Sequence, residues 1–374
     1  MSLRPETKAI HNAAIDPASG AIVPPIALST TFEYETTGLE HDPDQLIYTR
    51  WQNPNRAALE ATMAQLENGA LAHAVSSGSA AMLTIFQALR PGDHIVSSDD
   101  MYFGIRVQLN EFFAPWGLET SFVDMSDLAA VRAAMRPNTK LVILESPTNP
   151  MIRLADIAAI ADIAQESEAL LLVDNTVATP AAQHPIELGA DIVVLSLTKY
   201  IAGHHDVLGG AVIFAKDGEF AQRVTRLVKI GGAVLSPFNC WLALRGLQSL
   251  SYRLRAHSEN AGQVACFLAE HPKIERVLYP HHPSHPQYKL ALRQMKLGSG
   301  LMSVQVKGGR DAAIQLVNRL RLFTSATSFG GTHSLIEHRE SIEEGSSTPA
   351  NLLRVSIGLE HPADLIADLR QALA

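Results

Sequence analysis

Short apolar segments alternate with helical segments between residues 55 and 235, and this alternation constrains the fold more than any other feature. Helical spacing of apolar residues is clear in segments such as 154–167, LADIAAIADIAQES. Strands that alternate with helices predict βαβ units and a mostly parallel sheet, and nearly continuous apolar strands predict a sheet covered on both faces. The apolar runs lie at 93–99, 119–124, 140–147, 169–176, 191–199 and 209–215.

The domain plan follows from changes in sequence texture along the 374 residues. Residues 1–50 are polar and interrupted by prolines, which predicts an extended arm that contacts a neighbouring subunit. Residues 51–235 would form the larger α/β domain, and residues 236–374 a smaller α+β domain that begins with a long helical region. In the smaller domain, residues 281–291 are expected to be an exposed connector. Its strand-like segments lie at 301–309, 318–323 and 351–360.

Composition narrows the class of protein. A net charge of −8 argues against a nucleic-acid-binding protein, which needs a basic face. Two cysteines are too few for a disulfide framework and fit a reducing compartment. The first residues have no apolar signal core, and no apolar run is long enough to span a membrane. We therefore expect a soluble cytoplasmic protein.

Polar residues at the ends of predicted strands mark the candidate site, because open α/β sheets bind ligands beyond the carboxyl ends of their strands. Gly78 and Ser79 lie in a small-residue turn that opens a helix, which is either an anion site or an ordinary N-cap. Asp174 follows an apolar run, and its carboxylate needs a partner, either a cationic ring nitrogen or a helix N-terminus. Glu145 and Asn149 follow another strand and are a weak signal alone.

Lys199 stands at the end of the next apolar run. Two residues with hydroxyl groups, Ser196 and Thr198, come shortly before it. A partly desolvated lysine has a lowered pKa and can form an imine, although a surface lysine is the commoner reading of any single lysine. The two hydroxyls could both donate to one phosphate. A phosphate cradle, an aspartate for a ring nitrogen and an imine lysine together are the needs of pyridoxal 5′-phosphate (PLP).

Other cofactors have less support. The histidines of GHHD (203–206) and HHPSHP (281–286) could suggest metal ligands, but no cysteine and no other spaced ligand set completes a site, so no metal is expected. A Gly-x-Gly-x-x-Gly or Walker-type loop is absent from the sequence, so nucleotide cofactors lack support.

The ordered motifs resemble the Cys/Met-metabolism (trans-sulfuration) PLP enzymes, a family that includes cystathionine γ-synthase and γ-lyase. The similarity runs nearly end to end and implies the type I, aminotransferase-like fold, with a seven-stranded, mostly parallel sheet in a PLP-binding domain and a smaller α+β C-terminal domain. The matching segments are ETKAIHNAAIDPASGAIVPPIALSTTF, YTRWQNPN, SSGSAA, ESPTNP, VDNTVATP, SLTKYIAGHHDVLGG, SFGGTHSLIEH and LLRVSIGLE.

The resemblance implies roles for the cofactor site. Lys199 would hold PLP as an internal aldimine, and Asp174 would pair with the pyridinium nitrogen so that a quinonoid can form. Tyr102 would stack on the ring and assist acid–base steps. Tyr48 and Arg50 would reach the phosphate of the neighbouring subunit, which implies a catalytic dimer, usually paired into a homotetramer. The phosphate itself would be bound by Gly78, Ser79, Ser196 and Thr198.

The resemblance also implies that the substrate is an amino acid. Its α-carboxylate would be held by Asn149, Ser328 and Arg354. Without the resemblance, Arg354 reads as a salt bridge at a strand end. Thr327 replaces a family glutamate that would meet the distal amino group of cystathionine. Phe103 and Ile105 replace common small residues and are expected to change the wall near the leaving group.

These features predict a PLP-dependent lyase or transferase that acts on the Cγ–S or Cγ–O bond of amino acids derived from homoserine or homocysteine. The alternatives are a cystathionine β-lyase, a methionine γ-lyase, or a γ-lyase of an unusual substrate such as canavanine. From a different class, the chain could be an inactive binding protein on this fold, against which the Lys199–Asp174 pair speaks.

Overall fold

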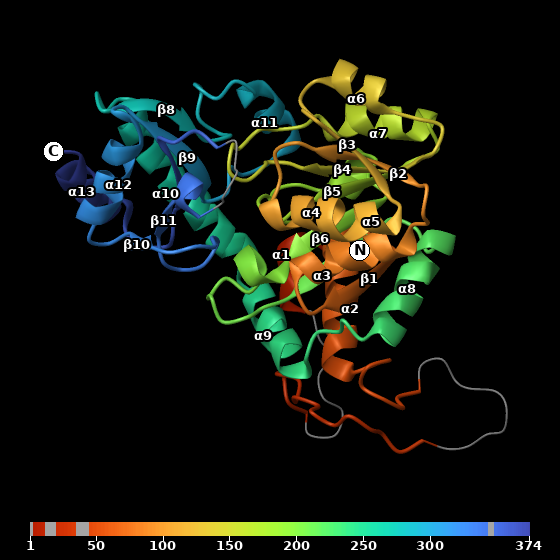
Figure 1. Cartoon of the computed structure of the whole chain (residues 1–374). Coiled ribbons are helices and arrows are strands. Elements are labelled where there is room, and N and C mark those ends of the chain that lie inside the picture. The colour runs from red at the N-terminus through yellow and green to blue at the C-terminus, as the bar shows by residue number, and fades with distance from the viewer. Residues whose placement is uncertain (1–2, 12–19, 35–44, 343–347) are drawn as a thin grey trace.

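The computed structural model describes residues 3–11, 20–34, 45–342 and 348–374 and contains two β-sheets with helices packed on them (Figure 1). In the larger sheet, of order β1-β7-β6-β5-β4-β2-β3, only β7 runs antiparallel to its neighbours. Its strands are β1 (Leu71–Val75), β2 (His94–Ser98), β3 (Glu119–Val123), β4 (Thr139–Glu145), β5 (Leu170–Asp174), β6 (Ile192–Ser196) and β7 (Gly210–Phe214). All six predicted apolar runs lie on these strands, so the expected mostly parallel sheet is confirmed.

Helices cover both faces of this sheet because its strands are apolar on both sides. Leu141 and Ile143 of β4 pack with one set of helices, and Val142 and Leu144 pack with the opposite set. The first set is α3 (Gly78–Ala88), α4 (Phe103–Val107), η1 (Gln108–Phe113) and α8 (Glu219–Gly231). The short α5 (Ala114–Trp116) continues η1 and buries none of its own residues. The opposite face carries α6 (Leu128–Ala134), α7 (Ile157–Glu166), α2 (Pro54–Glu67) and α9 (Pro237–Leu247).

The second sheet has the order β10-β11-β12-β9-β8 and lies beside the first, with the C-terminus on its outer side (Figure 1). Residues 318–323, expected as a strand, instead finish α12 (Gly309–Arg319) and turn, because Ala313 and Leu316 bury one face of that helix. Its elements are α10 (Leu250–Ala269), β8 (Ile274–Leu278), β9 (Leu301–Val306), α12 (Gly309–Arg319), β10 (Thr324–Ser325), β11 (Leu335–His338), β12 (Leu352–Ser356) and α13 (Pro362–Leu373). Within the described ranges, no helix is both long and apolar enough to cross a membrane.

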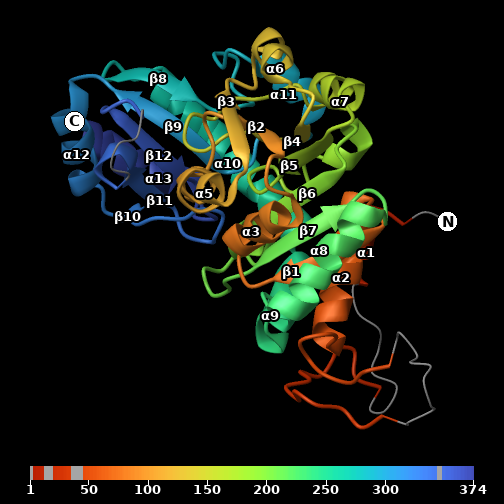
Figure 2. The same ribbon diagram turned by 45° about the vertical axis from the view of Figure 1, so that its right-hand side comes forward.

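The N-terminal region is extended only in part. The prediction of an arm over residues 1–50 is wrong for α1 (Pro5–Ile10), a short helix whose Ala9 is buried in the core beside α2. Residues 20–34 project from the body near α2 and α9 in both views (Figure 1, Figure 2), and the Trp241 indole donates to the Pro24 carbonyl oxygen at 3.1 Å. Residues 1–2, 12–19 and 35–44 of the predicted arm lie outside the described residues.

The prediction of an exposed connector at 281–291 holds only in part, because Pro283, Ser284, Pro286 and Lys289 are exposed but other residues are not. His285 is buried, and its Nε2 lies 3.0 Å from the carbonyl oxygen of Ile152. The Leu154 amide donates to the Gln287 side chain at 2.8 Å, just before α11 (Tyr288–Gln294) begins. Backbone groups of Ile152 and Leu154, in the turn after β4, have no partner in a neighbouring strand, and His285 and Gln287 supply their hydrogen bonds. The segment therefore fastens the second half of the chain to the first.

Candidate active site

The carboxyl ends of β4, β5 and β6 open on a cavity of about 270 Å³ that residues of both sheets line. This is the place where parallel α/β sheets bind ligands. Of the residues predicted to bind the cofactor or the substrate, Tyr48 and Arg50 lie outside its lining. The cavity brings together Gly78, Ser79, Tyr102, Asn149, Asp174, Ser196, Thr198, Lys199, Thr327, Ser328 and Arg354.

Lys199 lies within η3 (Leu197–Ile201), which directly follows β6, and it forms a kink there, with a non-helical φ of −91° and ψ of −132°. Its Nζ donates to the Ser328 hydroxyl at 2.7 Å and lies 4.8 Å from the centroid of the Phe329 ring. Burial, and then the positive charge of Arg354, lower the pKa of Lys199 to about 8. A substantial fraction of this amine is therefore neutral in mildly basic solution, which is what an imine-forming lysine requires.

The part of the cavity beside Gly78 and Ser196 is suited to an anion. The Ser77 hydroxyl accepts from the Ala80 amide at 3.0 Å and caps α3, whose first amides face the cavity edge. A Cβ on Gly78 would lie 3.1 Å from the Ser196 Cβ, so glycine lets the helix approach the end of β6. A Cβ on Gly210 would lie only 2.2 Å from the Ser77 carbonyl oxygen. The Thr198 hydroxyl contacts Gly209, accepting from its amide at 3.1 Å.

Two neighbouring carboxylates form the floor of the cavity. Asp174 accepts from the Thr176 amide at 2.9 Å, and burial raises the pKa of Asp174. Glu145, its neighbour in register on β4, accepts from the Tyr102 amide at 2.9 Å. Burial, and then Asp174, raise the pKa of Glu145 well above its usual range. Among the described residues no cation forms an ion pair with Asp174, so a cationic ligand would stabilise its charged form.

These features fit PLP: an anion cradle for its phosphate, a neutralisable primary amine for its aldehyde, and a buried carboxylate for its ring nitrogen. Tyr102 lies at the same cavity with 46% of its surface exposed. A Cβ on Gly104 would lie 2.6 Å from the Tyr102 ring, so the ring position depends on this glycine.

Arg354 joins the two sheets at the cavity wall. Arg354 stands on β12. Its Nη1 donates to the side-chain oxygen of Asn149 at 3.2 Å, and Asn149 lies in the turn after β4. Its Nη2 donates to the Ser328 carbonyl oxygen at 3.1 Å and forms an ion pair with Glu337 at 2.5 Å. Ser328 has a φ of +86°, an uncommon backbone conformation for serine that this arginine helps to hold. The residues predicted for the α-carboxylate are thus in one cluster, and Arg354 forms the salt bridge that was its alternative reading. Their role toward a substrate stays a prediction.

Sequence reasoning missed two buried residues of this cluster. Glu337 faces Arg354 across the β11–β12 pair, and the Arg339 Nη1 donates to the same Glu337 oxygen at 2.9 Å. Arg339 lines the cavity and lowers the pKa of Lys199 further. Arg339 and Arg354 therefore meet at the same oxygen of Glu337. Only the position of Arg339 just after the SFGGTHSLIEH segment hinted at its role.

The wall beyond Tyr102 differs from the prediction in one residue. Ile105 lines the cavity, as expected, and so does Thr327, which is exposed. Phe103, which was also expected there, is 43% exposed and does not line the cavity. The helix α4 begins at this residue, so the side chain of Phe103 is directed away from the site occupied by Ile105 two residues later.

Tyr48 and Arg50, at the end of the predicted arm, do not line the cavity of their own chain. Tyr48 pairs with Thr31 in a short antiparallel bridge, and the Arg50 guanidinium lies 5.5 Å from the centroid of the Tyr48 ring. The Arg50 Nη1 also donates to the Lys229 carbonyl oxygen at 2.5 Å. Their assignment to a neighbouring subunit stays a prediction.

The chain is similar to proteins of one enzyme family. A family model described as Cys/Met metabolism PLP-dependent enzyme matches residues 6–374. Cystathionine gamma-synthase of Mycobacterium tuberculosis is 46% identical, over 99% of this chain and 96% of that protein. Cystathionine gamma-lyase of Dictyostelium discoideum is 42% identical, over 98% and 97%. The crystal structure of metB from Corynebacterium glutamicum has a TM-score of 0.96 and 39% identity, over 100% of this chain and 98% of that one.

Proposed function

The chain belongs to the Cys/Met-metabolism family of PLP-dependent enzymes, and on that premise we propose that it acts at Cγ of an amino acid derived from homoserine or homocysteine. It is a PLP-dependent trans-sulfuration enzyme. One structural observation supports PLP chemistry on an amino acid: Lys199 Nζ, 2.7 Å from the Ser328 hydroxyl, lies in the same cavity as Arg354, the proposed carboxylate anchor, and Asp174. The names of the similar proteins, one a γ-synthase and one a γ-lyase, support Cγ as the reacting carbon.

The cofactor would be held at three points. Lys199 would bind its aldehyde covalently and Asp174 its ring nitrogen, while Tyr102 would cover the ring. When bound, PLP accepts the electron pair left at Cα after proton removal. The phosphate would be bound by the amides of Gly78 and Ser79 and the hydroxyls of Ser196 and Thr198.

The substrate would be oriented by its α-carboxylate. Arg354 presents a planar fork of donors that matches a carboxylate, and Asn149 and Ser328 flank it. Once the substrate amine has displaced it, Lys199 would be free to take the proton from Cα and to move a proton at Cβ, which lets a Cγ substituent depart. The departing group would face Thr327 and Ile105, which line the cavity.

A product assay on the purified holoenzyme tests this function. The substrates are cystathionine, methionine, canavanine, and O-acetyl- and O-succinylhomoserine with and without cysteine, with products identified by mass spectrometry. Formation of 2-oxobutanoate or of cystathionine would place the reaction at Cγ. Pyruvate and homocysteine released from cystathionine would instead show a β-lyase and overturn the Cγ proposal.

The substrate preference is expected to depend on Thr327. An exposed threonine at the cavity wall leaves room for a longer side chain, and a glutamate there could pair with a distal ammonium group. Thr327→Glu should raise kcat/KM for cystathionine roughly tenfold or more, because a hydrogen bond to a charged group contributes about 1.5–3 kcal/mol. Thr327→Gln, the uncharged control of equal size, should give a much smaller gain. Equal effects of the two variants would show that the negative charge is not what matters.

The lowered pKa of Lys199 predicts a pH dependence for covalent PLP uptake by the cofactor-free protein. Only the neutral amine attacks an aldehyde, and the amine is protonated below its pKa of about 8. The uptake rate, followed by absorbance, should therefore rise with pH through about 8 and level off above it. Pyridoxine 5′-phosphate, which has no aldehyde, provides the control for non-covalent binding. A rate without change between about pH 6 and 10 would contradict the assignment.

The assembly and location of the enzyme are part of the same proposal. The projecting segment 20–34 carries exposed Ile22 and Leu28, which suit a contact with a second copy of the chain. Tyr48 and Arg50 follow this segment and would reach the partner's phosphate site. We propose a catalytic dimer, paired into a homotetramer, and a cytoplasmic location.

A further inference from the structure

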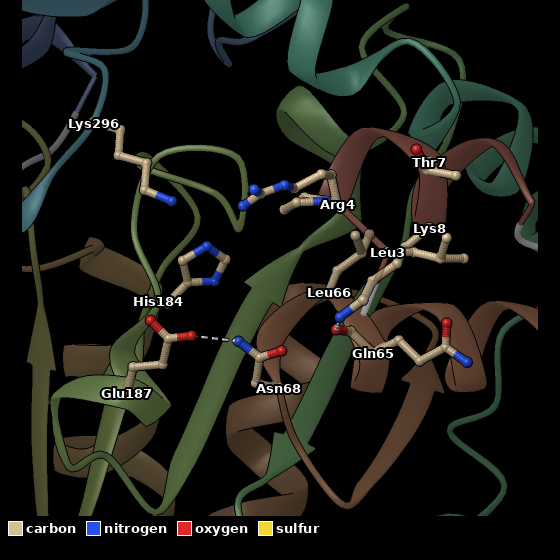
Figure 3. Close-up of a pocket in the computed structure, with 11 residues that line it drawn as sticks. Leu3, Arg4, Thr7, Lys8, Gln65, Leu66, Asn68, His184, Glu187 and Lys296 are labelled. Carbon is tan, nitrogen blue, oxygen red and sulfur yellow. Dashed lines mark hydrogen bonds between the residues drawn. The ribbon is translucent and has the colours of Figure 1, made fainter. Parts of the chain in front are cut away.

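A second cavity, of about 670 Å³, shares no lining residue with the active site. It lies where the start of α1 meets the end of α2, the short helix η2 (Pro185–Leu188) and the segment between α11 and β9 (Figure 3). Its volume is in the range of small-molecule pockets, which is about 300–1,000 Å³. None of the roles proposed above uses it.

Cationic side chains from separate parts of the chain converge on this cavity. The Arg4 guanidinium and the Lys296 amino group point toward one another across it, and the His184 imidazole lies below them (Figure 3). Lys8 contributes a third permanent positive charge, and its Nζ also donates to the Gln65 carbonyl oxygen at 3.3 Å. This concentration of positive charge occurs in a chain of net charge −8, so it is a local feature.

Little negative charge within the cavity balances these cations. Among its described lining residues, Glu187 is the single carboxylate, and the Asn68 side chain donates to it at 2.7 Å. Burial lowers the pKa of His184, and Lys296 and Lys8 lower it further, while Glu187 raises it. The fields of the two lysines therefore overlap at the imidazole.

The backbone fixes part of this arrangement. The Lys296 amide donates to the Ala182 carbonyl oxygen at 2.8 Å, which holds that residue beside the strand connection that carries His184. Arg4 directly precedes α1, whose Ala9 anchors the helix in the core. A ligand between Arg4 and Lys296 would thus link the N-terminal helix to a segment of the second half of the chain.

We propose that this cavity binds a small polyanion that carries two or more phosphate or carboxylate groups. One group would be held by Arg4, whose fork of donors suits either chemistry, and another by Lys296, with His184 between them. A nucleic acid is a poorer candidate, because the rest of the chain offers no net positive charge to follow a backbone.

Calorimetric titration of the PLP-saturated holoenzyme with pyrophosphate and with citrate, at constant ionic strength, tests the proposal. Saturating PLP keeps the phosphate site of the active cavity filled. We expect saturable binding of at least one probe, weakened about tenfold to a hundredfold by Lys296→Gln or Arg4→Gln, since each removes a charge-assisted hydrogen bond. Lys289→Gln removes an exposed positive charge outside the cavity, seven residues before Lys296, and should leave the affinity unchanged.

The two probes separate the two chemistries. Binding of pyrophosphate alone would assign phosphate groups to the ligand, and binding of citrate alone would assign carboxylates. The proposal fails if neither probe binds the unmodified holoenzyme, or if Lys289→Gln weakens binding as much as Lys296→Gln does. Circular dichroism of each variant checks that a lost signal does not come from lost folding.

Discussion

Replacement of Lys199 by alanine is expected to abolish turnover, with kcat falling at least about a thousandfold, because one group would supply both covalent attachment and proton transfer. Lys199 Nζ is the only primary amine among the described residues that line the active cavity. Its 2.7 Å contact with the Ser328 hydroxyl places it beside the carboxylate anchor, where Cα of a substrate would lie. Borohydride reduction followed by peptide mass spectrometry should find PLP on Lys199 of the unmodified enzyme and on no residue of the variant.

Loss of folding is not expected to explain that result. Burial disfavours the charge of Lys199, so alanine removes a group that the cavity partly desolvates. The cofactor-free variant should therefore unfold at a temperature no lower than that of the cofactor-free parent, measured by calorimetry at neutral pH. A variant that retained normal turnover would exclude Lys199 from the chemistry altogether.

Replacement of Arg354 by alanine is expected to raise KM by about tenfold to a hundredfold for every amino-acid substrate, since a charged hydrogen bond contributes about 1.5–3 kcal/mol. The size of the increase should not depend on the group at Cγ, because Arg354 would contact the carboxylate common to all substrates. Steady-state kinetics with two substrates that differ only at Cγ measure this. An unchanged KM would mean that the carboxylate is anchored elsewhere.

Arg354 also compensates the buried charge of Glu337, so the alanine variant has a second defect. Loss of one partner of a buried ion pair can cost about 3–5 kcal/mol, although Arg339 still contacts the same oxygen here. The double variant Arg354→Ala, Glu337→Gln removes the charge left behind and should recover much of the stability without restoring KM. Arg354→Lys retains a positive charge but not the planar fork, and should lie between the parent and Arg354→Ala in KM.

The sequence was sufficient to predict those residues of the active cavity that lie at the carboxyl ends of strands. Lys199 and Asp174 each follow an apolar run, and the C-terminal ends of parallel strands meet at one edge of a sheet, so their proximity follows from local pattern alone. Gly78 could be recognised for a related reason, because a small-residue turn before a helix exposes backbone amides.

The residues that sequence reasoning missed depend on contacts between distant segments. Glu337 meets Arg354 only through the β11–β12 register, which the apolar pattern of either strand does not determine. His285 is buried because a turn more than a hundred residues earlier needs a hydrogen-bond partner, and its own surroundings of proline and histidine suggest a surface loop. The short helix α1 could not be predicted for the same reason, because it is stabilised by tertiary packing on α2 and not by its own sequence pattern.

The bond between Arg354 and Asn149 has a consequence for how remote mutations act. It joins the two sheets at the point where a substrate carboxylate would bind, so substrate affinity and the fit between the two halves of the molecule are thermodynamically linked. The contact of His285 with Ile152 holds the same two halves together outside the cavity. Weakening that contact would leave a fraction of the enzyme unable to bind substrate. The apparent affinity would then fall by the same factor for every substrate.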